Sequence, residues 1–222
     1  MKAVVLVPWR GGNDHRERSW AFVEARWREL GLPIVTGDAP GSFSRAASRN
    51  LAAELAGDWD VALFVDADTL VRDPGPVREA LELAHRTGKV VIPHDEYVGL
   101  SANGTALLLA GQGRGWQRIL RRVAGAPLGV IAVPRVAWET LGGFDERFSG
   151  WGGEDVAFAR AARTLVGVVR LPGQIWHLWH PRDTSKAAYL EGPKELTARY
   201  GAAVGDVAAM RALLDERQAV AA

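Results

Sequence analysis

The sequence contains no cysteine, and it also lacks any long hydrophobic run. Without cysteine the chain can form no disulfide framework, no zinc–sulfur site and no thiolate nucleophile. No stretch approaches the roughly 20 apolar residues that a membrane-spanning helix needs. The apolar run near the N-terminus is too short for a signal peptide. We therefore expect a cytoplasmic protein without a membrane span.

An excess of charge of one sign is missing as well. The chain has 27 lysines and arginines against 26 acidic residues, which gives a formal net charge of +1. So small a charge provides no electrostatic reason to expect a polyanionic partner, and nucleic acid is therefore not indicated. The length of 222 residues and the hydrophobic content of 48% are typical of one globular domain with at most a short appendage.

Strand and helix signals alternate over the first ninety residues. Strands are expected at 3–7, 32–36, 61–65 and 90–93, and helices at 16–30, after a cap at Ser42 or Ser44, and at 76–86. Later strands are expected at 128–133, 166–170 and 174–178, and helices at 134–141, at 154–165 and in two segments beyond 185; residues 103–115 are expected to form a strand followed by a glycine-rich loop. This order predicts an α/β fold with a mostly parallel central sheet and helices on both faces, with ligands at the carboxyl ends of the strands.

Two carboxylates directly follow the third expected strand, in the run Asp66-Ala67-Asp68. On a tight turn at a strand end, such a pair can hold a divalent cation against a diphosphate and offset the charge of the leaving group. Taken alone the spacing is a weak signal, because aspartates are also frequent as turn and cap residues.

Two of the five histidines stand close together, in the run His177-Leu178-Trp179-His180. Both imidazoles can face one ion, and a site that combines imidazole with carboxylate suits manganese and other first-row metals better than calcium. The competing interpretation is a pair of separate surface histidines.

The run Trp151-Gly152-Gly153-Glu154-Asp155 places two acids at the start of an expected helix. The helix dipole would keep Asp155 ionised, and an ionised carboxylate within reach of a hydroxyl can act as a general base. Equally, Glu and Asp are common in the first turn of any helix because they complement its dipole.

These motifs, in this order, resemble the GT-A glycosyltransferases, most closely the β-1,4-galactosyltransferase and bacterial chondroitin polymerase type. The resemblance rests on Val7-Pro8-Trp9-Arg10, Phe43-Ser44-Arg45-Ala46, Val65-Asp66-Ala67-Asp68, Gly142-Gly143-Phe144-Asp145, Gly150-Trp151-Gly152-Gly153-Glu154-Asp155 and His177-x-x-His180. It implies a Rossmann-like GT-A catalytic domain at 1–184 and a C-terminal helical extension at 185–222. The galactosyltransferases have a methionine where this chain has His177, which leaves the metal preference open between manganese and magnesium.

Roles for single residues follow from the same resemblance. The donor nucleotide is expected to contact Pro8, Trp9, Arg10, Asp38, Phe43, Arg45, Asp66, Asp68 and Trp151. The acceptor is expected at Trp151, Glu154 and Asp155, with Asp155 as the catalytic base beside Glu154. The expected metal ligands, for Mn²⁺ or Mg²⁺, are Asp68, His180 and His177.

The sequence therefore predicts an inverting, metal-dependent glycosyltransferase that moves a sugar from a nucleoside-diphosphate donor, UDP in the first place, to an acceptor hydroxyl. The acceptor is open among saccharides, lipids, proteins and modified bases. Alternatives are a sugar nucleotidyltransferase, a sugar-binding GT-A domain without activity, and a ferrous oxygenase that uses Asp68, His177 and His180 as a facial triad.

Overall fold

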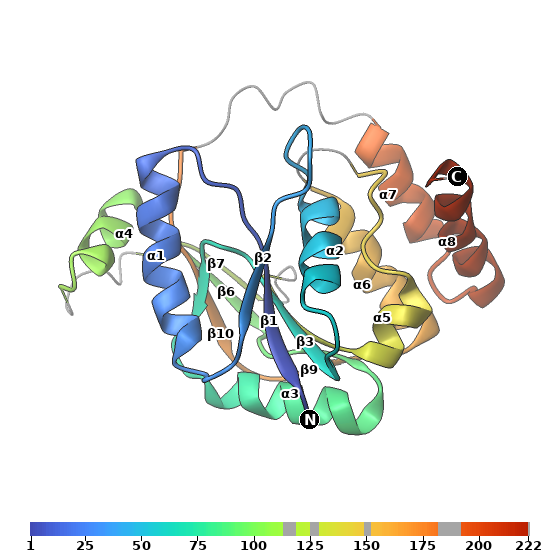
Figure 1. The fold of residues 1–222 in the computed structure, drawn as a ribbon, viewed down its shortest axis with the longest axis horizontal. Coiled ribbons are helices and arrows are strands. Elements are labelled where there is room, and N and C mark those ends of the chain that lie inside the picture. Colours follow the sequence, from blue (N-terminus) through green and yellow to red (C-terminus); the bar gives the residue numbers. More distant parts are fainter. Residues whose placement is uncertain (113–118, 125–128, 149–151, 182–191, 222) are drawn as a thin grey trace.

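The computed structural model describes residues 1–112, 119–124, 129–148, 152–181 and 192–221 (Figure 1). Its central sheet has the strand order β2-β1-β3-β8-β5-β9. The strands are β1 (Ala3–Pro8), β2 (Ile34–Gly37), β3 (Val61–Val65), β5 (Val90–Ile92), β8 (Val130–Pro134) and β9 (Val168–Arg170). Strand β1 runs parallel to β2 and β3, and β5 runs parallel to β9. The α/β fold expected from the alternation is therefore confirmed.

One strand of the central sheet departs from the parallel arrangement. Strand β8 is antiparallel to both of its neighbours, β3 and β5. It enters the sheet after a long excursion that contains a second, smaller sheet, so its direction is not set by a simple strand–helix–strand crossover. The sequence pattern of a buried strand indicates its presence but not its direction.

The second sheet was not expected. It has the order β4-β10-β6-β7, with β4 (Thr69–Val71), β6 (Glu96–Leu100), β7 (Ile119–Ala124) and β10 (Gln174–His177). Of these strands, β10 alone was expected. The strand predicted to begin at residue 103 is wrong: α4 (Ala102–Leu109) is a helix, started by Ser101, whose Oγ accepts a 3.0 Å hydrogen bond from Gly104 N. Residues 113–115 of that prediction lie outside the described residues.

Successive residues of each central strand point to opposite faces, and each face is covered by a different layer. Val4 and Leu6 face a core that includes residues of α2 (Arg45–Leu55), α5 (Arg135–Leu141) and α6 (Glu154–Leu165). Val5 and Val7 face a core shared with α1 (Asp14–Arg28), α3 (Gly75–Thr87) and the second sheet. Helices on both faces therefore bury the sheet, as the sequence predicted.

The C-terminal helices join the first of these cores. Helices α7 (Gly192–Ala202) and α8 (Val207–Ala221) pack beside α6 (Figure 1). Tyr200 of α7, Met210 and Leu213 of α8, and Ala203 in the turn between them belong to the buried cluster. The predicted boundary at residue 184 falls outside the described residues. These two helices therefore share a hydrophobic core with the sheet domain.

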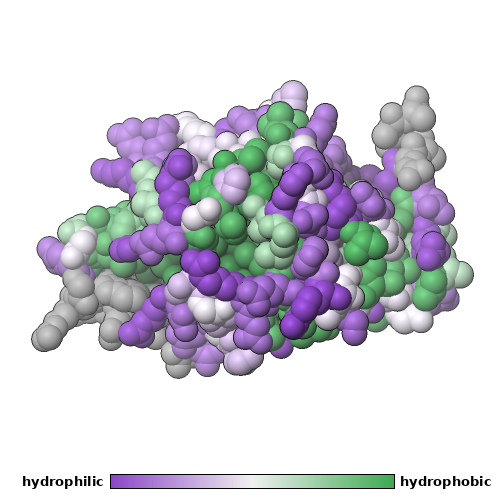
Figure 2. Space-filling view, turned by 60° about the horizontal axis from the view of Figure 1, so that its bottom comes forward, coloured by the Kyte–Doolittle hydropathy of each residue, from purple (hydrophilic) through white to green (hydrophobic). Residues whose placement is uncertain are grey.

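The surface is mixed in character. Figure 2 shows hydrophilic residues over most of the face that it presents, with smaller hydrophobic groups between them. Among the described helices, none combines the length and the apolar character that crossing a membrane requires.

Candidate functional site

The polar motifs meet at the carboxyl ends of the central strands. Pro8 ends β1 opposite Gly37, the last residue of β2, and Trp9 N donates a 2.9 Å hydrogen bond to Gly37 O. A Cβ at Gly37 would stand 2.0 Å from Ser48 O of α2. Only glycine therefore lets α2 approach the sheet closely enough to bring its N-terminal turn beside the ends of β1 and β3.

Three predicted metal ligands converge at this edge. The ligand atoms of Asp68, His177 and His180 all lie within 4.8 Å of one another. Asp68 Oδ2 is 3.5 Å from His177 Nε2 and 3.6 Å from His180 Nε2. One carboxylate oxygen and two imidazole nitrogens facing a common point form a donor set that fits manganese and similar divalent ions.

The backbone around the histidines fixes their orientation. His180 Nδ1 lies 3.0 Å from Pro181 O, and because a carbonyl only accepts, Nδ1 carries the proton. In the neutral ring this leaves the lone pair on Nε2, the atom that faces Asp68. His177 pairs with Thr69 across β10 and β4, so its position follows from the ladder of the small sheet.

Two further hydrogen bonds hold the ligand-bearing segments together. Leu178 N donates to Asp68 O at 2.8 Å, and Trp179 N donates to Thr105 Oγ1 at 2.8 Å. Thr105, on α4, is 2% exposed. A helix that was expected to be a strand therefore supports the loop between the two histidines.

A network of two arginines and two carboxylates lies next to the triad. On α2, Arg49 Nη2 is 2.6 Å from Asp66 Oδ1 and Arg49 Nη1 is 3.3 Å from Glu154 Oε1. Arg45 Nη2 is 3.1 Å from Asp66 Oδ2, and Arg45 Nε is 3.1 Å from Glu154 Oε1. The side chains of Arg49 and Glu154 are 3% and 2% exposed, so these charges are almost fully removed from water.

Electrostatics within this network favour the charged forms. Burial alone would raise the pKa of Asp66, but the guanidinium groups of Arg45 and Arg49 outweigh it and lower that pKa below its ordinary value. Burial alone would likewise lower the pKa of Arg45, but the carboxylates of Asp66 and Glu154 outweigh it and raise that pKa. Asp66 and Arg45 are thus held in their charged forms within the cluster between β3, α2 and α6.

Asp155 is the second residue of α6, directly after the buried Glu154, and is partly exposed. Its carboxylate and that of Asp68 both act on Arg45, after burial and the closer Asp66 and Glu154. Asp68 and the predicted base Asp155 therefore both lie near the same guanidinium. Trp151 lies outside the described residues.

The predicted donor-binding residues near the N-terminus form a second group beside the network. Arg10 Nε lies 2.5 Å from Asp38 Oδ1, and Arg10 also donates to the carbonyls of Gly41 and Ala39. The Arg10 guanidinium lies 5.5 Å from the centre of the Phe43 ring. Arg10 therefore holds the loop after β2 in place, which leaves it fewer free donors for a ligand.

Trp9, which follows β1, lies at the same edge of the sheet. Its ring stacks on that of Trp20, with ring centres 5.7 Å apart, and Arg16 lies 5.5 Å from the ring centres of both Trp9 and Phe43. Aromatic faces and guanidinium groups side by side are suited to stacking a base and pairing with phosphate.

Sequence reasoning gave no role at the site to Thr105 and His15, and it included Arg49 only as part of the helix start that resembles the family's nucleotide-contacting segment. Arg49 follows Arg45 by one helical turn, a spacing that places both on one face of α2 and was available as a signal. His15, in the first turn of α1, makes an edge contact with the Trp179 ring at 5.7 Å. Thr105 has no sequence signal of its own, because its role depends on a helix that the pattern did not predict.

Two comparisons with known proteins found similar proteins. Residues 115–183 match the family model described as the N-terminal domain of galactosyltransferase. That stretch contains the segment from Gly142 to Asp155 and both histidines of the triad. No curated protein matches the chain.

Solved structures with a similar fold include glycosyltransferases. The catalytic domain of Drosophila β1,4-galactosyltransferase 7 in complex with xylobiose is 20% identical, with a TM-score of 0.54 over 89% of this chain and 79% of that one. A mutant of that enzyme in complex with manganese, UDP-Gal and xylobiose is also 20% identical, with a TM-score of 0.55 and coverages of 88% and 78%. Glucosyl-3-phosphoglycerate synthase from Mycobacterium tuberculosis, in complex with Mn²⁺, UDP and glucosyl-3-phosphoglycerate, is 15% identical, with a TM-score of 0.50 and coverages of 93% and 81%. The GT-A fold expected from the sequence is confirmed, and the family match agrees with the expected glycosyltransferase class.

Proposed function

We propose that this chain is a metal-dependent, inverting glycosyltransferase that moves a sugar from UDP to an acceptor hydroxyl. The observation that carries the proposal is the convergence of the Asp68–His177–His180 triad, the Arg45 guanidinium and the helix start with Asp155 at one edge of the sheet. Four segments that lie apart in the sequence build this arrangement. The transfer of a sugar needs a site for the nucleotide-sugar, for the cation and for the acceptor hydroxyl side by side. The matched galactosyltransferase model and the UDP-bound and manganese-bound neighbours support the same assignment.

Manganese fits the residues present, and magnesium is the alternative ion. Asp68, His177 and His180 would hold it, since their ligand atoms already face one another and His180 Nε2 is free to bind. When bound, the ion would neutralise diphosphate oxygens and stabilise the charge on the leaving group. Trp9 and Phe43 would stack against the base, and Arg45 would pair with phosphate where it now faces Asp66 and Glu154.

The acceptor reaction is assigned to Asp155. Its carboxylate accepts the acceptor's hydroxyl proton while that oxygen bonds to the anomeric carbon. The bond from that carbon to the diphosphate oxygen breaks, and its electron pair leaves with the UDP. A single displacement of this kind inverts the anomeric centre, so an α-linked donor gives a β-linked product. A positioned base contributes about 10²- to 10⁴-fold to such a step.

Glu154 is assigned a different role from that of Asp155. Its side chain is 2% exposed, and its Oε1 forms ion pairs with both Arg45 and Arg49. A carboxylate held in this way orients the two arginines and fixes the start of α6, while the neighbouring, partly exposed Asp155 remains accessible. We therefore place Glu154 behind the reacting groups, as a positioning residue for the base.

The test is a product assay with UDP-galactose and UDP-glucose, with and without manganese. Manganese-stimulated release of UDP supports the proposal, whereas release of pyrophosphate from UTP and a sugar phosphate would favour a nucleotidyltransferase. Asp155→Asn should lower turnover about 10²-fold or more while UDP binding is retained. Asp215→Asn, at an exposed position on α8, is the matched control and should leave turnover unchanged. Equal loss of UDP affinity and turnover in Asp155→Asn, or an α-linked product, would refute the assigned mechanism.

A further inference from the structure

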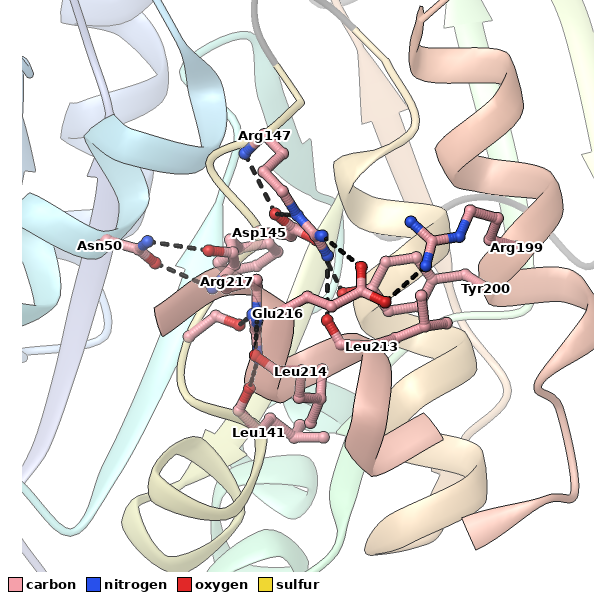
Figure 3. A network of polar contacts seen from close by, with 12 residues as sticks. Asn50, Leu141, Asp145, Arg147, Arg199, Tyr200, Leu213, Leu214, Glu216 and Arg217 are labelled. Atoms are coloured by element: carbon pink, nitrogen blue, oxygen red, sulfur yellow. Dashed lines mark hydrogen bonds and ion pairs between the residues drawn. The ribbon is translucent and has the colours of Figure 1, made fainter. Parts of the chain in front are cut away.

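A dense polar network joins the C-terminal helices to residues 142–148, the segment that precedes α6 (Figure 3). Its centre is Asp145, which is 3% exposed. Asp145 Oδ2 accepts a 2.8 Å hydrogen bond from Tyr200 OH of α7 and another of 2.8 Å from Arg147 Nη2. Asp145 Oδ1 accepts from Arg147 N at 3.1 Å and from Arg147 Nε at 3.0 Å. Four donors thus hold one buried carboxylate in a single orientation.

Arg147 carries this contact on to α8. Its Nη1 lies 3.0 Å from Glu216 Oε2, and its Nη2 donates to Leu213 O at 3.0 Å. Glu216 is in turn held by Arg199 of α7, whose Nη2 lies 2.6 Å from Glu216 Oε1. Arg147 therefore contacts both a side chain and a backbone carbonyl of α8, and it is linked to Tyr200 of α7 through Asp145.

An arginine of α8, Arg217, reaches the start of the same segment. Arg217 Nη1 donates to Gly143 O at 3.1 Å, and Arg217 Nη2 donates to Leu141 O. Leu141 is the last residue of α5, where free carbonyl groups and the negative end of the helix dipole favour a cation. Both ends of α8's contact with the segment are thus made through guanidinium groups.

Packing extends the contact to the first residue before α6. The Phe148 ring, 2% exposed, lies 6.2 Å from the Tyr200 ring. Gly153, at φ 95°, is so close to Phe148 and to Thr197 of α7 that an added Cβ would meet their side chains at 2.7 Å and 2.9 Å. Because Gly153 directly precedes Glu154 and Asp155, α7 lies against the point where α6 begins.

The energetics favour a rigid unit. Burial alone would raise the pKa of Asp145, but hydrogen bonds from Arg147 and Tyr200 outweigh it and keep that pKa below its ordinary value. Burial and the charge of Asp145 raise the pKa of Tyr200, so its hydroxyl remains a donor. A buried carboxylate that loses a donor retains its desolvation cost, so each bond here resists opening by more than a surface contact would.

We propose that helices α7 and α8 position the N-terminal end of α6, and with it Asp155, through Arg147, Asp145 and Tyr200. This inference rests on the proposed function, in which Asp155 is the base. The C-terminal helices contribute no group to the metal triad or to the arginine–carboxylate network in the described part of the chain. Disrupting their contacts should therefore slow the chemical step and leave the affinity for the nucleotide unchanged.

The experiment compares Arg147→Gln with Arg211→Gln, both in the full chain. Arg211 is an exposed arginine of α8 and serves as the matched control. Three quantities are measured below the unfolding transition: the Kd of UDP with manganese by calorimetry, the rate of UDP-galactose hydrolysis with manganese, and amide exchange in the first turn of α6. In Arg147→Gln we expect hydrolysis to fall about 10- to 100-fold because the base is displaced. The UDP Kd should stay unchanged and exchange at 154–157 should become faster.

Tyr200→Phe removes one hydroxyl and serves as the milder variant if Arg147→Gln does not fold. It should slow hydrolysis and speed amide exchange at 154–157 as Arg147→Gln does, but by less, and it should leave the UDP Kd unchanged. A Kd that rises in step with the loss of hydrolysis, or exchange and hydrolysis equal to those of Arg211→Gln, would overturn the inference. A wild-type protein that neither binds UDP nor hydrolyses UDP-galactose would refute the proposed function. In that case amide exchange alone would test whether α7 and α8 position the start of α6. Unchanged exchange in both Arg147→Gln and Tyr200→Phe would overturn the inference.

Discussion

Replacing Arg49 by methionine should expose how strongly the buried charge network holds the site together. The substitution keeps a long apolar side chain but removes both ion pairs, to Asp66 Oδ1 and Glu154 Oε1, and the contact of the guanidinium with the Phe144 ring at 4.7 Å. Two carboxylates would then share Arg45. Breaking a buried pair by removing one partner costs about 3–5 kcal/mol.

For a chain of this length that loss corresponds to a fall in Tm of about 6–20 °C, since each kcal/mol moves Tm by about 2–4 °C. The measurement is thermal and urea unfolding of both proteins at pH 7. The control is Arg28→Met, which breaks a surface pair with Glu24 in which the arginine is 66% exposed. That variant should lose at most about 1 kcal/mol.

The pH dependence gives the reasoning a second test. The pKa of Asp66 is lowered in the folded protein because the two guanidinium groups outweigh burial. Asp66 therefore contributes to stability at pH values above its pKa in the unfolded chain, and this contribution is lost as the pH falls through its pKa in the folded protein. The stability gap between wild type and Arg49→Met should therefore be full at pH 7 and narrow below about pH 4. A gap under about 1 kcal/mol, or one that stays constant with pH, would refute the network as a source of stability.

Three further outcomes are expected. Bound manganese should stabilise the folded wild type by about 2.7 kcal/mol at a hundredfold excess over Kd, and should therefore raise its Tm. His180→Ala should abolish that rise in a thermal-shift assay. Gly37→Ala should lower the free energy of unfolding in urea by about 1–3 kcal/mol or more, because its Cβ would meet a backbone oxygen of α2 at 2.0 Å. His94 is fully buried, and burial and then the Arg170 charge lower its pKa from 6.5 to about 4. Because its folded pKa is depressed, the unfolded chain binds the extra proton, and stability should fall by about 3 kcal/mol between pH 6.5 and 4. His94→Leu should flatten that part of the pH–stability curve, and an unchanged slope would contradict the assignment.

The sequence was sufficient for the central sheet because its strands are continuous apolar runs followed by helices with clear periodicity. It was also sufficient to predict that Asp68, His177 and His180 lie close together, since Asp68 follows soon after a buried strand and the two histidines stand three residues apart. The second sheet was not predictable in this way. Its strands β4, β6 and β7 are short or mixed in polarity, and β4 and β6 are ordered by pairing with β10, which lies far along the chain (Ile175 pairs with Val71 and with Tyr97).

Helix α4 shows why local pattern misleads at such places. Its leucines follow one another without a polar face, which fits a buried strand as well as a helix. The deciding signals are the Ser101 cap and the contact of Thr105 with Trp179, and the second of these is purely tertiary. The same holds for Arg49, whose charge could be satisfied only by carboxylates from two other elements.

The small sheet has a thermodynamic consequence for the ion it would serve. Pairing of β4 with β10, together with the hydrogen bond from Leu178 N to Asp68 O, sets the ligands in place through the backbone before any ion arrives. Little conformational entropy then remains to be lost on loading. Selection among divalent ions should accordingly follow the intrinsic affinity series of nitrogen and oxygen donors, and emptying the site should leave the chain folded.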